Sequence, residues 1–182
     1  SKYSDIYVAV DKNRREGIAR LTSDEETSDT DVVLLDDAFQ HRYVKPGINI
    51  LLVDYHRLII YDELLPAGHL REPKEGKNRA DIVIVTKCPK DLKPMEFRVL
   101  TRAMSLFPYQ ALFFTTLVYK DLKGVFNDKS MPLSAISPST AIMLLTGIAS
   151  PQQMTVDLQN YGSQIVPLSF PDHHAFTGKD IE

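Results

Sequence analysis

The chain has 182 residues, of which 43% are hydrophobic and 25% are charged, and this composition is typical of a globular protein that buries a core. Its formal net charge of -3 gives no electrostatic reason to expect nucleic-acid binding, which depends on clustered Lys and Arg. The single cysteine, Cys88, excludes an intrachain disulfide, and apolar runs of about seven to nine residues are too short for a membrane-spanning helix of roughly 20. No signal peptide is recognisable, and because the chain starts with Ser-Lys rather than Met we expect a fragment of a longer protein.

Short apolar segments recur along the chain and predict strands that are buried on both faces. They are residues 5–10, 32–36, 48–54, 80–87, 111–119, 141–145 and 164–170. Segments of helical character lie between several of them, at residues 14–21, 94–107 and 150–162. In the last of these, Ser150 suits the N-cap, Pro151 the first helical position and Gly162 the C-terminal end. This alternation predicts an α/β fold with a mainly parallel sheet.

Two regions depart from the alternation of strands and helices. Residues 55–79 are too long and too mixed in character for a simple connection, and we interpret them as a functional loop. Residues 109–130 contain two extended segments around the sequence KDLKG and predict a β-ribbon that could link two lobes. The predicted domains are therefore a first lobe at 1–108, the ribbon, and a second, smaller α/β lobe at 131–182.

The sequence VVLLDDAFQHR, residues 32–42, places Asp36 and Asp37 at the end of an apolar run. Ligands of open α/β sheets bind beyond the carboxyl ends of the strands, so these aspartates lie where a site is expected. Adjacent carboxylates repel each other unless a cation or a proton relieves the repulsion, and Mg²⁺ prefers such oxygen ligands. A solvated strand end would carry the same short pattern, so the pattern alone leaves both interpretations open.

Donor groups follow the aspartates and favour a site for anionic oxygens. Gln40, His41 and Arg42 come directly afterwards in the same segment. In the motif LLPAGHLREP, residues 64–73, Pro and Gly define a loop from which Arg71 could clamp a phosphate or carboxylate while Glu72 orients it. The alternative for Arg71 and Glu72 is a surface pair on a rigid turn, which would contribute little.

The motif FPDHHAF, residues 170–176, adds Asp172, His173 and His174 after a predicted strand. These residues could supply a general base with its orienting carboxylate, or metal ligands. Adjacent side chains point to different sides of most backbones, so we expect one functional and one packing histidine. Two surface histidines in a turn remain the alternative.

The sequence lacks the phosphate-cradling pattern GxxxxGK[ST]. Its two Gly-Lys pairs, at 76–77 and 178–179, have neither the earlier Gly nor a following Ser or Thr. Arg14 and Arg15 follow the first predicted strand, either at a ligand-binding edge or in the solvent-facing first turn of a helix.

Taken together, LLDDAFQHR, ILLVD, LLPAGHLREP, ADIVIVTK and FPDHHAF, in this order and spacing, resemble the tetraacyldisaccharide 4'-kinase (lipid A 4'-kinase) family. The likeness runs from about Val8 to the C-terminus, although Ala38 stands where the family usually has Gly and His69 where it usually has Pro. It implies a P-loop-NTPase-like, mainly parallel sheet that continues through a β-ribbon into the smaller lobe. It also implies transfer of the ATP γ-phosphate to the 4'-hydroxyl of a membrane-embedded disaccharide 1-phosphate.

The resemblance also implies roles for individual residues. Asp36 and Asp37 would be catalytic and hold Mg²⁺, and His173 would help to activate the sugar hydroxyl. Residues expected near the phosphates, the substrates or the active-site loop are Arg14, Gln40, His41, Arg42, Arg71 and Glu72. The phosphate loop and the carboxylate partner of His173 would precede Ser1, so we expect little kinase activity from residues 1–182 alone.

The implied ligands are ATP as co-substrate, Mg²⁺, and tetraacyldisaccharide 1-phosphate, with no nucleic-acid partner. We expect a peripheral protein at the cytoplasmic face of the inner membrane of a Gram-negative bacterium, touching the membrane through segments outside this chain. Two alternatives remain open from the residues themselves. One is a metal-dependent hydrolase with Asp36, Asp37, His41 and His173 as ligands, and the other is a non-catalytic α/β binding domain.

Overall fold

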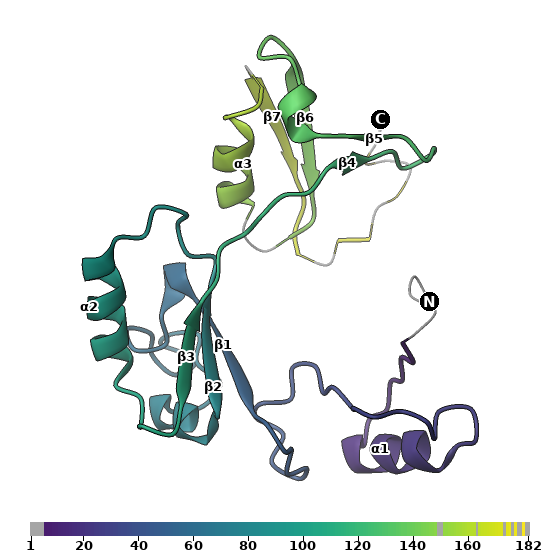
Figure 1. Cartoon of the computed structure of the whole chain (residues 1–182), viewed down its shortest axis with the longest axis vertical. Helices are drawn as coiled ribbons and strands as arrows, with labels where there is room; N and C mark the ends of the chain where they lie inside the picture. Colours follow the sequence, from purple (N-terminus) through teal and green to yellow (C-terminus); the bar gives the residue numbers. More distant parts are fainter. Residues whose placement is uncertain are drawn as a thin grey trace. The chain divides into compact units, whose positions relative to one another are not determined.

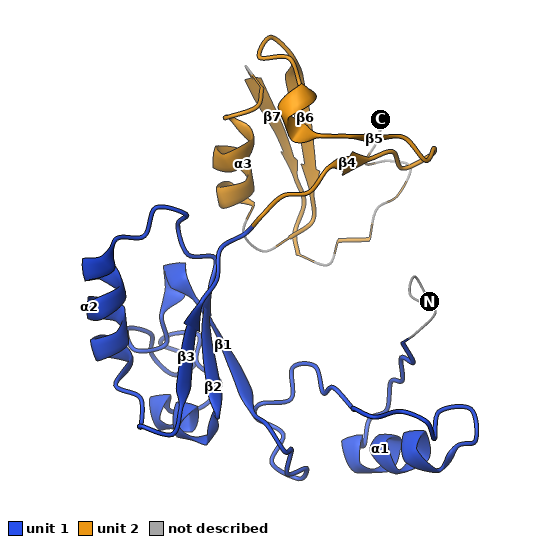
Figure 2. Ribbon diagram, in the orientation of Figure 1, with its two compact units in different colours: residues 1–117 blue, residues 118–182 orange. Residues whose placement is uncertain are grey.

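The computed structural model describes residues 6–148, 151–162, 164–172, 174–175, 177 and 180. It separates into two compact units, residues 1–117 and 118–182, which are described in turn (Figure 2). The boundary lies inside the range 109–130 that was expected to link two lobes, and the three-part division itself stays a prediction. No helix in the described ranges is long and apolar enough to cross a membrane.

Unit 1 contains a three-stranded parallel sheet in the order β1-β2-β3 (Figure 1). Its elements in chain order are α1 (Arg14–Ser23), β1 (Ile50–Asp54), η1 (Tyr55–Arg57), η2 (Lys74–Arg79), β2 (Ile82–Thr86), α2 (Pro94–Met104) and β3 (Ala111–Phe114), where η denotes a 3₁₀ helix. Ile82 of β2 is in register with Ile50 of β1 and with Ala111 of β3. The parallel α/β architecture expected from the sequence is therefore confirmed.

The core of unit 1 lies between the sheet and α2. Val83 and Val85 of the central strand are fully buried and belong to one cluster with Leu100 and Met104 of α2. Because alternate side chains of a strand point to opposite faces, these residues share the face that α2 covers. Burial of each such side chain contributes roughly 1.5 to 3 kcal/mol.

The other face of this sheet is open, which corrects the expectation of strands buried on both faces. Ile50 and Leu52 of β1 are 49% and 64% exposed, and Phe113 of β3 is 54% exposed. Their side chains alternate with the buried ones, and among the described residues no helix or strand covers them. The apolar composition of the strands predicted their conformation but not the number of covering layers.

Helix α2 begins and ends at residues with clear local signals. Pro94 occupies its first turn, and the Glu96 carboxylate accepts a 2.7 Å hydrogen bond from the backbone N–H of Lys93, satisfying a free helix donor. The helix was expected to reach residue 107 but ends at Met104, because Ser105 adopts a left-handed conformation with φ of 45°.

Unit 2 contains a short hairpin and a two-stranded parallel sheet. Its elements are β4 (Leu122–Lys123), β5 (Ser130–Met131), η3 (Leu133–Ala135), β6 (Ala141–Thr146), α3 (Gln152–Leu158) and β7 (Gln164–Ser169). Helix α3 joins β6 to its parallel neighbour β7, and Leu133, Leu144 and Leu158 form the buried core. Pro151 occupies the N-cap of α3 rather than its first helical position, and Ser150 lies outside the described residues.

Three predicted strand segments differ in the structure. Residues 32–36 and the described part of 5–10 are not strands, and Val10 and Leu34 are 98% and 89% exposed. A strand needs a neighbour for its backbone hydrogen bonds, and no described strand pairs with either segment. Residues 111–114, assigned to the ribbon, instead form β3 of the parallel sheet, so the antiparallel hairpin is limited to β4 and β5.

Candidate active site

Asp37 and Arg71 connect the two sequence motifs directly. The Arg71 guanidinium donates two hydrogen bonds to the Asp37 carboxylate, with N–O distances of 2.5 and 3.0 Å. Asp37 has a φ of 44°, a left-handed conformation that Asp tolerates better than most residues. The hydrogen bonds from Arg71 hold the pKa of Asp37 below its usual value, and the positive charge of Arg14 acts in the same direction. Asp37 is therefore ionised at neutral pH.

A closed loop returns Arg71 to this position. The backbone N–H of Leu65 donates to the carbonyl of Leu70 at 3.0 Å, and Gly68 N–H donates to the carbonyl of Leu64 at 3.0 Å. A Cβ atom at Gly68 would lie 2.3 Å from the carbonyl oxygen of Glu63, so no larger residue fits this close approach. The motif LLPAGHLREP thus forms a defined loop, as its Pro and Gly content predicted.

Glu72 forms a second connection between the motifs. Its carboxylate accepts hydrogen bonds from Arg79 at 2.7 and 2.9 Å and from Arg42 at 3.2 Å. Arg79 also donates to the carbonyl of Phe39 at 3.1 Å, and its guanidinium lies 4.8 Å from the centroid of the Phe39 ring. Desolvation raises the pKa of Glu72, but the two arginines outweigh it and the pKa lies below its ordinary value.

Tight backbone packing holds Glu72 in place. A Cβ atom added at the buried Gly76 would lie 2.7 Å from the carboxyl carbon of Glu72. The Glu72 side chain is only 16% exposed, whereas Arg42 is 67% exposed. Glu72 is therefore the fixed member of the Arg42–Glu72–Arg79 network, and the outer face of Arg42 remains open to solvent.

Asp36, Gln40 and His41 have unused polar atoms. Asp36 and Gln40 are exposed, and within the described part of the chain neither makes a hydrogen bond or ion pair. The backbone N–H of His41 donates to the Ala38 carbonyl at 2.8 Å, which closes a turn, and its ring meets Tyr43 edge-on. The His41 Nε2 atom is buried without a hydrogen-bond partner among the described residues. Buried polar atoms are nearly always paired in folded proteins, so this nitrogen indicates a partner from a ligand or another segment.

The loop has an exposed carboxylate that could hold a magnesium ion. Among the described residues no three His, Cys, Asp or Glu side chains gather closely enough to form a metal site. Mg²⁺ needs only one or two carboxylates, because water and substrate phosphates supply its other ligands. The exposed carboxylate of Asp36 meets this requirement, whereas Asp37 already binds Arg71.

A further charged pair, which the sequence analysis did not single out, lies at the carboxyl end of the sheet. Asp54 ends β1, Lys87 follows β2, and the Lys87 Nζ atom lies 2.6 Å from the Asp54 carboxylate. Desolvation raises the pKa of Asp54, but hydrogen bonds from Lys87 and from the backbone N–H of His56 lower it below its usual value. The sequence signal that could have indicated this pair was a charged residue at the end of each of two predicted strands, which become neighbours in the sheet.

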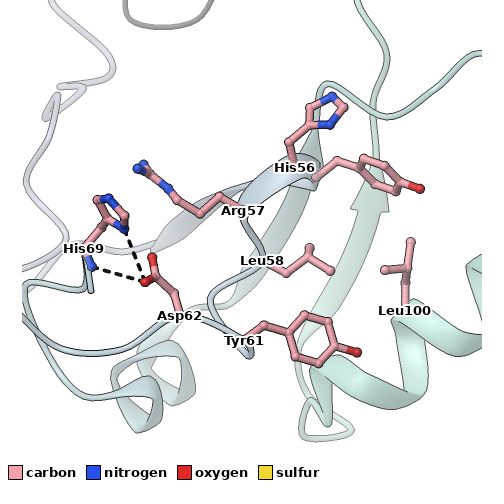
Figure 3. Close-up of a pocket in the computed structure, with 8 residues that line it drawn as sticks. His56, Arg57, Leu58, Tyr61, Asp62, His69 and Leu100 are labelled. Atoms are coloured by element: carbon pink, nitrogen blue, oxygen red, sulfur yellow. Dashed lines mark hydrogen bonds and ion pairs between the residues drawn. The ribbon is translucent and has the colours of Figure 1, made fainter. Parts of the chain in front are cut away.

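A cavity of about 470 Å³ lies beside this edge of the sheet, and Figure 3 shows the side chains that line it. Basic and aromatic side chains, including His56, Arg57 and Tyr61, line it. On one side the Asp62 carboxylate accepts a 3.1 Å hydrogen bond from the backbone N–H of His69 and lies 3.4 Å from its ring Nδ1 (Figure 3). The motif loop therefore contributes to the wall of this cavity as well as to the Asp37–Arg71 pair.

The family described as Tetraacyldisaccharide-1-P 4'-kinase matches residues 1–182, the whole length of the chain. The chain belongs to this family. It is 56% identical to the tetraacyldisaccharide 4'-kinase of Phocaeicola vulgatus over 182 residues, covering 100% of this chain and 50% of the relative. The corresponding enzyme of Porphyromonas gingivalis strain W83 is 42% identical over 181 residues, covering 99% of this chain and 50% of the relative. The chain thus spans about half the length of the curated relatives it matches.

A solved structure supports the same assignment. The crystal structure of LpxK from Aquifex aeolicus, described as in complex with ATP, is 29% identical and superimposes with a TM-score of 0.52. The match covers 79% of this chain and 42% of that chain. The family resemblance and the fold class expected from the sequence are therefore confirmed, and the comparisons give no support to a metal-dependent hydrolase.

The histidine pair of this tetraacyldisaccharide 4'-kinase family member is described only in part. His174 packs its ring on Phe170 with 4.6 Å between centroids, and its Nε2 lies 3.3 Å from the Asp180 carboxylate. This arrangement fits the expected packing histidine. His173, the expected catalytic histidine, lies outside the described residues, and its role stays a prediction.

Proposed function

We propose that the whole protein is a kinase that transfers the γ-phosphate of ATP to the 4'-hydroxyl of tetraacyldisaccharide 1-phosphate. The observation that carries the proposal is the family match over residues 1–182, together with the direct pairing of the two motif loops through Asp37 and Arg71. The relatives that carry this enzyme name reach 56% identity. The solved relative, whose title names ATP, supports ATP as the phosphate donor.

Phosphoryl transfer depends mainly on positioning and on neutralising negative charge, so the arginines of the site have clear roles. Arg71 is held with its fork of donors oriented by Asp37, and Arg42 is oriented by Glu72. Both arginine side chains are more than half exposed, at 55% and 67%, so phosphate oxygens can reach their guanidinium groups. Arg14 adds positive charge near Asp37.

Asp36 is the residue we assign to magnesium. Its carboxylate is exposed and unpaired within the described ranges, whereas the Asp37 carboxylate is engaged by Arg71. When bound, Mg²⁺ would offset the charge of the transferred phosphate. In this proposal Asp37 orients Arg71 before phosphate binds, and the exposed side chain of Gln40 and the unpaired Nε2 of His41 bind anionic oxygens or metal-bound water.

His173 is the proposed general base for the sugar hydroxyl, as the family resemblance implies. A hydroxyl group is a weak nucleophile, and a positioned base typically contributes about 10²- to 10⁴-fold to the rate. We further propose that the protein acts peripherally at the cytoplasmic face of the inner membrane of a Gram-negative bacterium, where its lipid substrate is made.

The proposal is tested with the full-length protein, radiolabelled ATP and tetraacyldisaccharide 1-phosphate. We expect Asp36→Ala and His173→Ala to reduce phosphate transfer at least 100-fold, while the control Asp31→Ala, an exposed aspartate in the same segment, retains activity. The Asp36 variant should also require a higher Mg²⁺ concentration. Normal turnover in both variants, or hydrolysis without transfer to the sugar in the unmodified protein, would refute the proposal.

A further inference from the structure

The hairpin of unit 2 ends in an exposed apolar tip. Strands β4 and β5 pair only through Leu122 with Met131 and Lys123 with Ser130. In the turn between them, Val125 is 87% exposed and Phe126 is 97% exposed. Every residue from 120 to 132 is exposed, and the hairpin extends away from β6 and β7 of the same unit (Figure 1).

The turn has a defined conformation that presents these two side chains outward. The Gly124 N–H donates to the Lys129 carbonyl at 2.8 Å, and the Lys129 N–H donates to the Asn127 side chain at 3.0 Å. A Cβ atom at Gly124 would lie 2.2 Å from the Asn127 side-chain oxygen and 2.9 Å from the Asn127 carbonyl oxygen, so a larger residue would force this close turn to shift. Neither Val125 nor Phe126 belongs to the core cluster of unit 2.

Positive charge is concentrated on the same hairpin. Residues 118–182 contain four Lys and no Arg, and three of these lysines are Lys120, Lys123 and Lys129. Two aspartates also lie on the hairpin, but the rest of unit 2 has four acidic residues and only one lysine. An apolar tip flanked by lysines is complementary to an anionic lipid surface, where aromatic and aliphatic groups enter the interface and lysines reach the headgroups.

We propose that Val125 and Phe126 insert into the interfacial region of a bilayer that contains anionic phospholipid. A protein partner is a poorer fit, because two exposed apolar side chains at the tip of a short hairpin offer far less than the roughly 800 Å² that each partner buries in a stable interface. A bilayer requires no complementary shape. The inference deepens the proposed function and rests on it for the lipid nature of the substrate. It adds a membrane contact within this chain to the contact expected from segments outside it.

The test uses the full-length protein and sucrose-loaded vesicles of phosphatidylethanolamine with or without phosphatidylglycerol. We expect the double variant Val125→Ser with Phe126→Ser to bind vesicles on the order of tenfold more weakly. The control Val156→Ser replaces a 57% exposed residue of α3 in the same unit and should bind normally. Replacing Lys120, Lys123 and Lys129 by Glu should remove the preference for anionic vesicles.

Insertion itself is followed with Phe126→Trp, since residues 1–182 contain no tryptophan. The difference spectrum against the unmodified protein should shift to shorter wavelength when anionic vesicles are added. Unchanged vesicle binding by the double serine variant, or an unshifted spectrum, overturns the proposal. It is equally overturned if the serine variant changes only the oligomeric state, because the tip then contacts a second copy. The vesicle experiments contain no ATP or saccharide. The membrane proposal and the kinase proposal can therefore be refuted separately.

Discussion

Replacing Glu72 by Ala should destabilise unit 1 as well as impair the site. The substitution removes the acceptor of Arg79, a side chain that is 33% exposed, and of the more exposed Arg42. A hydrogen bond to a charged group contributes about 1.5 to 3 kcal/mol, and because solvent screens Arg42 we attribute most of the loss to Arg79. We therefore expect the free energy of unfolding to fall by about 2 kcal/mol.

The assay is urea denaturation of the full-length protein at neutral pH. With a slope of about 2 kcal/mol per M, the unfolding midpoint should fall by about 1 M. Glu75→Ala is the matched control, because Glu75 is an exposed acid in the same 3₁₀ helix and should change the midpoint little. Gly76→Ala tests the same contact independently, since its new Cβ atom would displace the Glu72 carboxylate.

The pH dependence of this contribution follows from the pKa of Glu72. Its pKa in the folded protein lies below the ordinary value of 4.5, so the stabilisation is fully present above about pH 4.5. It is lost as the pH falls through the folded-state pKa. The difference in stability between the parent protein and Glu72→Ala should therefore shrink in acid. A difference that stays constant down to acid pH, or a midpoint equal to that of Glu75→Ala, would contradict this reasoning.

Three further predictions concern other parts of the molecule. Arg71→Lys should lower kcat/KM at least tenfold with little change in the unfolding midpoint, because the two-pronged contact with Asp37 is lost from an exposed pair. Val83→Ala should lower the free energy of unfolding by about 2 to 3 kcal/mol in the same urea assay, since a fully buried side chain of the central strand is truncated. Burial and the nearby Asp157 carboxylate raise the pKa of Tyr119 to about 12, so ultraviolet titration should show a late-ionising tyrosine that Tyr119→Phe removes. Because the folded-state pKa is the higher one, this stabilisation is complete below about pH 10 and is lost as the pH rises toward 12.

The sequence predicted the parallel strands well where their partners lie within the chain. The runs that became β1 and β2 are apolar, are bounded by polar residues and pair with each other. The run at 32–36 has the same composition but no described partner, and it is not a strand. Strand formation depends on a neighbour that composition cannot identify, which explains why equal patterns gave different outcomes.

The candidate site shows the same division between local and long-range information. Asp37 and Arg71 were each expected from their motifs, but they are 34 residues apart and their direct contact could not be deduced. Arg79 was not expected at all, because an arginine in a polar segment looks like a surface residue until Glu72 and Phe39 surround it. The sequence thus identified Asp37 and Arg71 as candidates from their motifs, whereas the contact between them could be found only from the fold.

Under the proposed function, the bidentate contact between Asp37 and Arg71 makes phosphate binding by Arg71 an exchange equilibrium. A phosphate group that takes Arg71 must displace a carboxylate that already satisfies it, so the net gain is the difference between two similar interactions. Added salt weakens both contacts, and its effects on this arginine should therefore largely cancel. The exchange also leaves the Asp37 carboxylate without Arg71 while the phosphate of ATP is bound. Under the proposed function a second free carboxylate then lies beside Asp36, so phosphate binding should raise the affinity for a cation.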